Sequence, residues 1–279
     1  MKLGQLLDEA LADAEAAHDA YLAGRPRGPI TGLASLDREL GGWLQPGLHI
    51  LHSNSGTGKT ALGWQAVTTA KHPAVFVSCE MGALELLRRL TARATSTYLG
   101  RLKSGELAPA VARQLYERAI ATAPRAYLVD ATLAYASPDY LLEVASLAKG
   151  QSIEFLLVLD SLHSWVEMLP DERASEYEAI NEGLASLRLL ANKLACPVLV
   201  IAERNRSAMK EGGINAGAGS RRIEFGSETV LSLDRKGKPD PRGIVTIEMV
   251  LDKNRHGATG RTITVLFDGA TQRFTEVDP

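Results

Sequence analysis

The 279-residue sequence is poor in cysteine and has no long apolar run. Its 2 cysteines, Cys79 and Cys196, lie alone within apolar segments, so we expect reduced, buried thiols and neither a disulfide framework nor a cysteine-based metal site. No uninterrupted apolar stretch approaches the roughly 20 residues of a membrane span, which argues against an integral membrane protein. Acidic residues interrupt the N-terminal region, so no secretory signal is expected and a cytoplasmic protein is predicted.

Neither sign of charge dominates, since the formal net charge is −2, and the chain as a whole has no general attraction to nucleic acid. The charges are nevertheless unevenly placed. Residues 1–24 hold five acidic residues and one lysine, whereas residues 204–222 hold five basic residues and one glutamate. The second segment has the local positive charge that a phosphate backbone attracts, although a solvated loop would have the same composition.

The N-terminal residues predict a separate helix. Leu3, Leu7 and Leu11 recur at helical spacing, and the helix is expected to end near Gly24, before the breaker run of residues 25–29. We therefore divide the chain into an N-terminal linker or docking helix, residues 1–28, and one main domain, residues 29–279. The apolar face of the helix either covers its own domain or docks on a neighbouring subunit.

From Ile30 onward, short apolar runs alternate with helical stretches. This alternation predicts an α/β fold, with a mostly parallel sheet flanked by helices and an antiparallel hairpin at its C-terminal edge. The expected strands are 48–51, 74–79, 126–129, 155–159, 198–202 and 229–233, with the hairpin at 244–251 and 261–267. The expected helices are 61–70, 83–95, 111–121, 140–147 and 175–194.

Residues 52–60, His-Ser-Asn-Ser-Gly-Thr-Gly-Lys-Thr, have the features of a phosphate-binding loop between a strand and a helix. Lys59 would reach the β- and γ-phosphates of ATP, and the Thr60 hydroxyl would hold Mg²⁺. Ser53 departs from the signature, which begins with glycine. The backbone N–H groups expected to surround the phosphates are those of Ser55, Gly56, Thr57, Gly58, Lys59 and Thr60.

Two acidic residues follow predicted strands. Asp160 ends the run 155–159, where a carboxylate can hold Mg²⁺ together with Thr60, although aspartate is also common there as a helix cap. Glu80 follows the run 74–79 and could orient and polarise an attacking water. From the residues alone, a helix-capping role for Glu80 is an equal alternative.

Further stretches form one combined pattern. They are 31–42 with 44–47, then Phe76-Val77-Ser78-Cys79-Glu80-Met81, then 198–207, and finally Lys253-Asn254-Arg255-His256-Gly257. Together, over residues 30–274, they resemble RecA-fold ATPases of the DnaB, RadA and KaiC group, and DnaB-like replicative helicases in particular. The resemblance implies a RecA-like P-loop NTPase fold and a catalytic role for Glu80.

The resemblance also implies a homo-oligomeric ring, a hexamer, in which Lys253 and Arg255 reach the γ-phosphate bound by the neighbouring subunit. Read from the residues alone, they form a basic hairpin tip of a kind that is usually solvated. Glu203 stands where these helicases usually carry a glutamine that senses the γ-phosphate. A carboxylate there would repel the phosphate unless it is protonated or paired with a cation such as Arg204.

For the basic segment 204–222, the resemblance implies contact with single-stranded DNA. Lys210, Arg221 and Arg222 would bind backbone phosphates. No aromatic residue occurs between Arg204 and Ile223, so we expect binding without base stacking, independent of sequence and sensitive to salt. A loader or another replication or recombination protein is the expected kind of protein partner.

The function predicted from these observations is a ring-forming ATP hydrolase that uses Mg²⁺ and translocates on, or unwinds, DNA. A RadA- or KaiC-like ATPase that acts in recombination, assembly or signalling without helicase activity is the alternative, and the stretch Asp160-Ser161-Leu162-His163 leans towards it. A third hypothesis is a nucleotide-gated accessory module with little hydrolysis, which Glu203 suggests.

Overall fold

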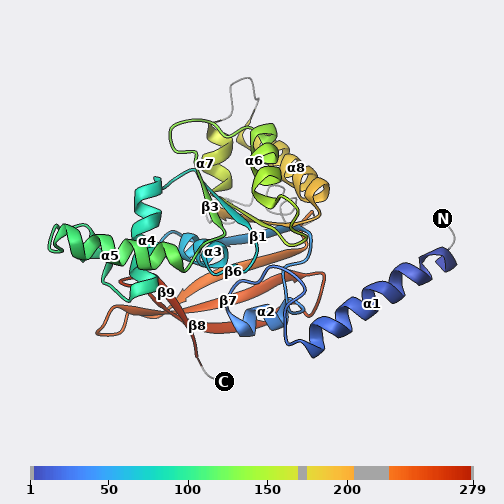
Figure 1. Ribbon diagram of the computed structural model, residues 1–279, viewed down its shortest axis with the longest axis horizontal. Coiled ribbons are helices and arrows are strands. Elements are labelled where there is room, and N and C mark those ends of the chain that lie inside the picture. The colour runs from blue at the N-terminus through green and yellow to red at the C-terminus, as the bar shows by residue number, and fades with distance from the viewer. Residues whose placement is uncertain (1–2, 169–174, 204–225, 278–279) are drawn as a thin grey trace, which may run out of the picture.

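A computed structural model describes residues 3–168, 175–203 and 226–277, apart from the side chains of residues 176 and 177. The described residues form one nine-stranded sheet in the order β3-β2-β4-β5-β1-β6-β7-β8-β9 (Figure 1). The six strands from β3 to β6 are parallel, and β7, β8 and β9 continue the sheet in antiparallel fashion. The strands are Gly47–Ser53 (β1), Ala74–Ser78 (β2), Ala126–Asp130 (β3), Leu156–Asp160 (β4), Pro197–Glu203 (β5), Thr229–Lys236 (β6), Ile244–Asn254 (β7), Thr262–Asp268 (β8) and Arg273–Glu276 (β9).

Helices pack on both faces of the sheet. Helices α6, α7 and α8 lie together on one face, and α2, α3, α4 and α5 contribute to the core on the other (Figure 1). The helices are Leu7–Leu22 (α1), Ala34–Glu39 (α2), Lys59–Thr68 (α3), Ala83–Thr95 (α4), Pro109–Ala121 (α5), Pro138–Lys149 (α6), Leu162–Glu167 (α7) and Glu176–Leu194 (α8), with short 3-10 turns at Leu3–Leu6 and Leu99–Leu102.

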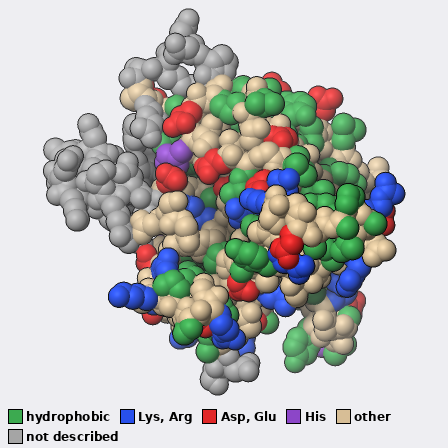
Figure 2. Space-filling view, turned by 90° about the vertical axis from the view of Figure 1, so that its left-hand side faces the viewer, with side chains coloured by type: hydrophobic (Ala, Val, Ile, Leu, Met, Phe, Trp, Pro, Cys, Tyr) green, Lys and Arg blue, Asp and Glu red, His purple; other side chains and the backbone are tan. Residues whose placement is uncertain are grey.

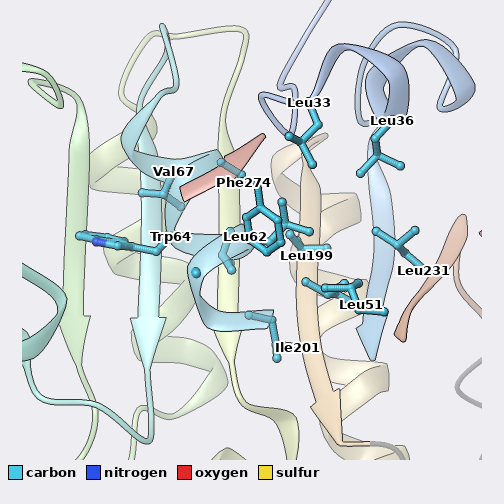
Figure 3. Close-up of a cluster of buried hydrophobic side chains, with 14 of the residues drawn as sticks. Leu33, Leu36, Leu51, Leu62, Trp64, Val67, Leu199, Ile201, Leu231 and Phe274 are labelled. Atoms are coloured by element: carbon cyan, nitrogen blue, oxygen red, sulfur yellow. The ribbon is translucent and has the colours of Figure 1, made fainter. Parts of the chain in front are cut away.

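The strands bury both of their faces because alternate side chains point to opposite sides of the sheet. In β2, Val75 and Val77 pack towards α6–α8, whereas Phe76 packs towards α3 and meets the Trp64 ring edge-on, with ring centroids 5.1 Å apart. Figure 3 shows the second of these cores, in which side chains from α3 meet the central strands. Buried parallel strands of this kind read as continuous apolar runs, which is why the sequence revealed them.

Helix α1 stands away from the body of the molecule (Figure 1). Leu3, in the 3-10 turn before the helix, and Leu7 and Leu11 within it have exposed fractions of 88%, 60% and 54%, while Ala20 near its end is buried. The leucine face therefore does not cover its own domain, and docking on a neighbour stays a prediction. The division at residue 28 stays a prediction.

The predicted α/β architecture is confirmed, but the position of the hairpin at the sheet edge is wrong. Strand β9 pairs with β8 and forms the edge instead. This strand has four residues, of which only Phe274 is buried, so it has no periodicity to detect. The six-residue helices α2 and α7 were also missed because they are too short for a recurring apolar pattern.

Cys79 and Cys196 are buried free thiols, as expected. Burial raises the pKa of each to about 12, so both are unreactive near neutral pH. Among the described residues, no helix combines the length and the apolar character that crossing a membrane requires.

His49 is a buried histidine in β1 with both ring nitrogens hydrogen-bonded. Its Nε2 lies 2.7 Å from the carbonyl oxygen of Gln45 and its Nδ1 2.8 Å from the Thr229 hydroxyl. The carbonyl can only accept, so Nε2 carries a proton and donates to it. In the neutral ring, which burial favours, Nδ1 accepts from the hydroxyl. Burial lowers the pKa of His49 from 6.5 to about 4.

This burial predicts a loss of stability in acid. Between pH 6.5 and about pH 4 the unfolded chain binds a proton at His49 that the folded chain does not, so stability falls as the pH falls. From pH 7 to pH 5, His49 should contribute a loss of about 2 kcal/mol in unfolding free energy. Urea denaturation at both pH values should show a smaller loss for His49→Gln than for the parent chain. The control is His18→Gln, on exposed α1, and an equal pH dependence in all three proteins would contradict the prediction.

Candidate active site

The predicted phosphate-binding loop connects the end of β1 at Ser53 to the start of α3 at Lys59. Gly56 and Gly58 have φ of +79° and +95°, a region that side chains other than hydrogen rarely allow. A Cβ on Gly58 would lie 2.8 Å from Cζ of Phe274, which belongs to β9. Glycine at position 58 is therefore required both by the backbone and by a neighbour from the far end of the chain.

Ser53, which replaces the first glycine of the signature, is fully buried and does not have a positive φ. Its hydroxyl donates to the carbonyl oxygen of Asn54 at 2.8 Å and also contacts the Thr57 hydroxyl. The Thr57 hydroxyl donates to the same carbonyl at 3.1 Å. The serine thus forms hydrogen bonds within the loop. Because position 53 does not need a positive φ, a serine fits there in place of glycine.

Lys59 is half-buried among acidic side chains. Its ammonium donates to the carbonyl oxygen of Ser53 at 2.8 Å. Burial lowers the pKa of Lys59, and the negative charges of Glu203, Glu80 and Asp160, in that order, act against the shift. The structure therefore brings together the lysine and the three carboxylates that the sequence analysis selected from three different strands.

Asp160, at the end of β4, is 1% exposed. Burial raises its pKa to about 6, while a hydrogen bond from the Thr60 side chain acts to lower it. Its Oδ2 atom is buried and has no hydrogen-bond partner among the described residues. A buried carboxylate oxygen without a partner, next to the Thr60 hydroxyl, fits a cation such as Mg²⁺.

The oxygen atoms of Thr60 and Asp160 also suit Mg²⁺ better than a metal ion whose ligands all come from protein side chains. Among the residues that the structure describes, no group of three His, Cys, Asp or Glu side chains could hold a metal ion. Mg²⁺ is commonly bound by one or two protein oxygens together with phosphates and water, which is what Thr60 and Asp160 can offer.

Glu80 lies two residues after β2 and is held by two serines that the sequence analysis did not select. The hydroxyls of Ser161 and Ser164 both donate to its Oε1, the second at 3.0 Å. Ser161 also caps α7 by accepting from the Ser164 N–H at 3.4 Å. A serine directly after a strand-ending aspartate is a helix-cap signal, and that signal could have located α7 but not its contact with Glu80.

Glu203 ends β5 opposite Ser53, its register partner on β1. Its backbone N–H donates to Nδ1 of His163 at 3.3 Å, which joins the end of β5 to α7. Of the nearby carboxylates, Glu203 has the largest effect on Lys59. Arg204, the cation suggested by the sequence, lies outside the described residues, and Lys59 supplies a positive charge beside Glu203 instead.

Lys253 and Arg255 lie on the side of the sheet where the parallel strands begin, whereas the candidate active site lies where these strands end. Lys253 pairs with Val230 near the start of β6, whereas Ser53 pairs with Leu233, three residues further along. Arg255 forms an ion pair of 3.1 Å with Glu228 of its own chain. Neither side chain therefore reaches the site of the same chain. Lys210, Arg221 and Arg222 lie outside the described residues.

A mostly parallel sheet with a phosphate-binding loop after β1 and a buried aspartate at the end of β4 defines a RecA-like P-loop domain. The profile of the family described as "DnaB-like helicase C terminal domain" matches residues 28–276, and the chain therefore belongs to this family. Membership implies a nucleotide-binding domain.

Individual relatives agree with this assignment. The chain is 27% identical over 274 residues to "Replicative DNA helicase DnaB" of Leifsonia xyli subsp. xyli (strain CTCB07), covering 92% of this chain and 57% of that protein. The chain thus spans little more than half the length of this relative. Two solved structures share the fold at 18% identity. One is the structure of an ATPase domain (TM-score 0.80, covering 98% of this chain and 99% of that one), and the other is "The Structure Of A DnaB-Like Replicative Helicase And Its Interactions With Primase" (TM-score 0.78, covering 100% of this chain and 67% of that one).

The Phe274 contact predicts that Gly58→Ala destabilises the fold more than a positive φ alone explains. Strain and overlap together should lower the unfolding free energy by about 2–4 kcal/mol. Gly105→Ala is the matched control because Gly105 has a φ of +80° and no heavy atom within 4 Å of the added Cβ, so about 1 kcal/mol is expected there. Urea denaturation of the two variants measures the difference, and equal losses would show that Phe274 does not constrain the loop.

Proposed function

We propose that this chain is the ATPase domain of a DnaB-like helicase, which hydrolyses ATP with Mg²⁺ and uses the energy to translocate on, or unwind, DNA. The observation that carries the proposal is the convergence of Lys59, Asp160 and Glu80 at the carboxyl edge of the sheet, next to the phosphate-binding loop. Ligands of open α/β sheets bind at this edge. Membership in the DnaB-like family supports the choice of activity.

The loop would bind the triphosphate of ATP through the backbone N–H groups of residues 55–60 at the start of α3. The Lys59 ammonium would contact the β- and γ-phosphates, and Thr60 with Asp160 would hold Mg²⁺. When bound, Mg²⁺ supplies positive charge that neutralises the phosphate oxygens. A cation at Asp160 would also favour the ionised carboxylate, which burial alone disfavours.

Glu80 would orient and polarise the attacking water. Both serine hydroxyls contact Oε1, and Oε2 makes no hydrogen bond to the described residues, so Oε2 is the oxygen available to a water. Ser161 and Ser164 are then positioning residues, which hold one oxygen of the carboxylate so that the other keeps a defined direction. Glu203 would lie near the γ-phosphate, where Lys59 offsets its charge.

The site would be completed by a second copy of the chain. The position of Lys253 and Arg255, away from the phosphate-binding loop of their own chain, supports a role at the nucleotide of a neighbouring subunit. A ring, which we propose to be a hexamer, would place both residues against the neighbour's phosphate-binding loop. The exposed leucine face of α1 supports such an assembly, since a second subunit is one surface that could cover it.

The DNA-binding and partner proposals have separate support. The positive charge of residues 204–222 supports contact with the single-stranded DNA backbone through Lys210, Arg221 and Arg222. The resemblance to a DnaB-like replicative helicase whose structure is described with its primase interactions supports a primase, or a loader, as protein partner.

ATP turnover with and without single-stranded DNA tests the proposal. We expect DNA to stimulate turnover, and we expect Glu80→Gln and Arg255→Ala each to reduce the stimulated rate by about 10²-fold or more, because each removes a group that acts in the transition state. Glu143→Gln, on α6, is the control for loss of a carboxylate. Turnover that ignores DNA would contradict the helicase proposal and leave an assembly or signalling ATPase. Tight ATP binding without turnover would indicate an accessory module.

A further inference from the structure

A cavity of about 680 Å³ lies at the end of α3 that is remote from the phosphate-binding loop. It is open to solvent and is lined by residues at or just beyond the ends of α3, α4 and α5 and by the first residues of β9. Helix α3 has ten residues and so spans about 15 Å between the candidate active site and this cavity. Phe274 lies against both the cavity and the loop at Gly58, but the basic residues of the lining are at the far end of α3, so the two sites are distinct. The volume is within the range of small-molecule pockets.

The lining of the cavity is strongly basic. It contains Lys71, Arg93, Arg125 and Arg273 and no acidic residue. Among the described residues, none of the four forms an ion pair with a carboxylate. Elsewhere on the molecule charged side chains often do form such pairs, as Lys236 does with Glu248 at 2.8 Å.

Arg93 is the central member of this group. Its Nη2 donates to the Thr68 hydroxyl, but its Nη1 is buried and has no hydrogen-bond partner among the described residues. Burial, and then the nearby positive charge of Arg273, lowers the pKa of Arg93 to about 10. A half-buried guanidinium whose one buried donor is unused, beside a like charge, is unfavourable unless an anion compensates it.

Arg273 is fixed in place beside Arg93 and is not free to turn away. Its Nη2 donates to the carbonyl oxygen of Arg93 at 2.9 Å and to the Ser96 hydroxyl at 3.1 Å. These two bonds attach the start of β9 to the end of α4. The fold therefore holds two guanidinium groups at one cavity by backbone and hydroxyl contacts, without any carboxylate between them.

We propose that this cavity binds a small polyphosphate anion, of the pyrophosphate or nucleoside polyphosphate class. Guanidinium groups match phosphate oxygens in geometry, and four cations around one cavity suit a ligand that concentrates several negative charges in a small volume. A nucleic-acid backbone spreads single charges along a track instead. On the face that carries α4 and α5, Figure 2 shows acidic, basic and hydrophobic side chains interspersed, which does not form such a track.

Isothermal titration of the full chain with pyrophosphate tests this site. The experiment is done in a Lys59→Ala background, without divalent metal, so that the phosphate-binding loop does not contribute. We expect saturable binding in this background, weakened at least about tenfold by Arg93→Gln and by Arg273→Gln, because each removes charged hydrogen bonds to the anion. The matched control is Arg113→Gln, which removes an arginine of 79% side-chain exposure on α5 and should leave binding unchanged.

Three results would overturn the proposal, two from the titrations and one from a competition experiment. One is the absence of pyrophosphate binding in Lys59→Ala, which would leave the phosphate-binding loop as the sole anion site. Another is equal binding by the Arg93, Arg273 and Arg113 variants, which would mean that pyrophosphate responds to the general surface charge and not to this cavity. Displacement of pyrophosphate by a thymidine 20-mer would also count against it, since the site would then be one for nucleic acid. Because Arg93 has no carboxylate partner, Arg93→Gln should fold, and Arg125→Gln provides a second variant at the same cavity.

Discussion

The parallel pairing of β2, β4, β5 and β1 is the constraint on which the site depends. Its register places Ser78 beside Asp160, Asp160 beside Ile201, and Glu203 beside Ser53. Strand ends that are up to 150 residues apart in the sequence therefore share one edge of the sheet. The apolar side chains of both faces hold that register, because a slip by one residue would exchange the two cores.

The electrostatics of the site follow from this convergence. Three carboxylates near one lysine leave an excess of negative charge. The pKa of Asp160 is raised first by its burial and then by the negative charge of Glu80. A triphosphate adds more negative charge, so in our proposal binding needs a divalent cation and further positive groups. Lys253 and Arg255 lie too far from the phosphate-binding loop of their own chain to supply this positive charge. In our proposal they supply it to a neighbouring subunit, so hydrolysis depends on assembly. In our proposal, the site is therefore complete only between two subunits.

Sequence patterns predicted the parts of the fold that are local or periodic. The apolar runs of β2 and β4, the phosphate-binding loop and the acidic residues that follow the strands were all visible in this way. The contact of Phe274 with Gly58 was not, because β9 is short and the two residues are far apart along the chain. The serines that hold Glu80 depend on α7, which is too short for a periodic signal. The basic cavity joins four segments whose proximity only the tertiary structure reveals.

The central claim, that each site is shared by two subunits, is tested most directly by mixing two inactive variants. In a mixed ring, the Arg255→Ala chain keeps Glu80 and the Glu80→Gln chain keeps Arg255. An interface in which these two intact residues meet has a complete site. Random assembly gives such interfaces about a quarter of the time, so ATP turnover should recover when the two are combined and reassembled. Combining Glu80→Gln with Lys59→Ala should give no recovery, because both lesions lie on the same side of the interface. No recovery in the first mixture, with assembly verified by mass, would contradict the account.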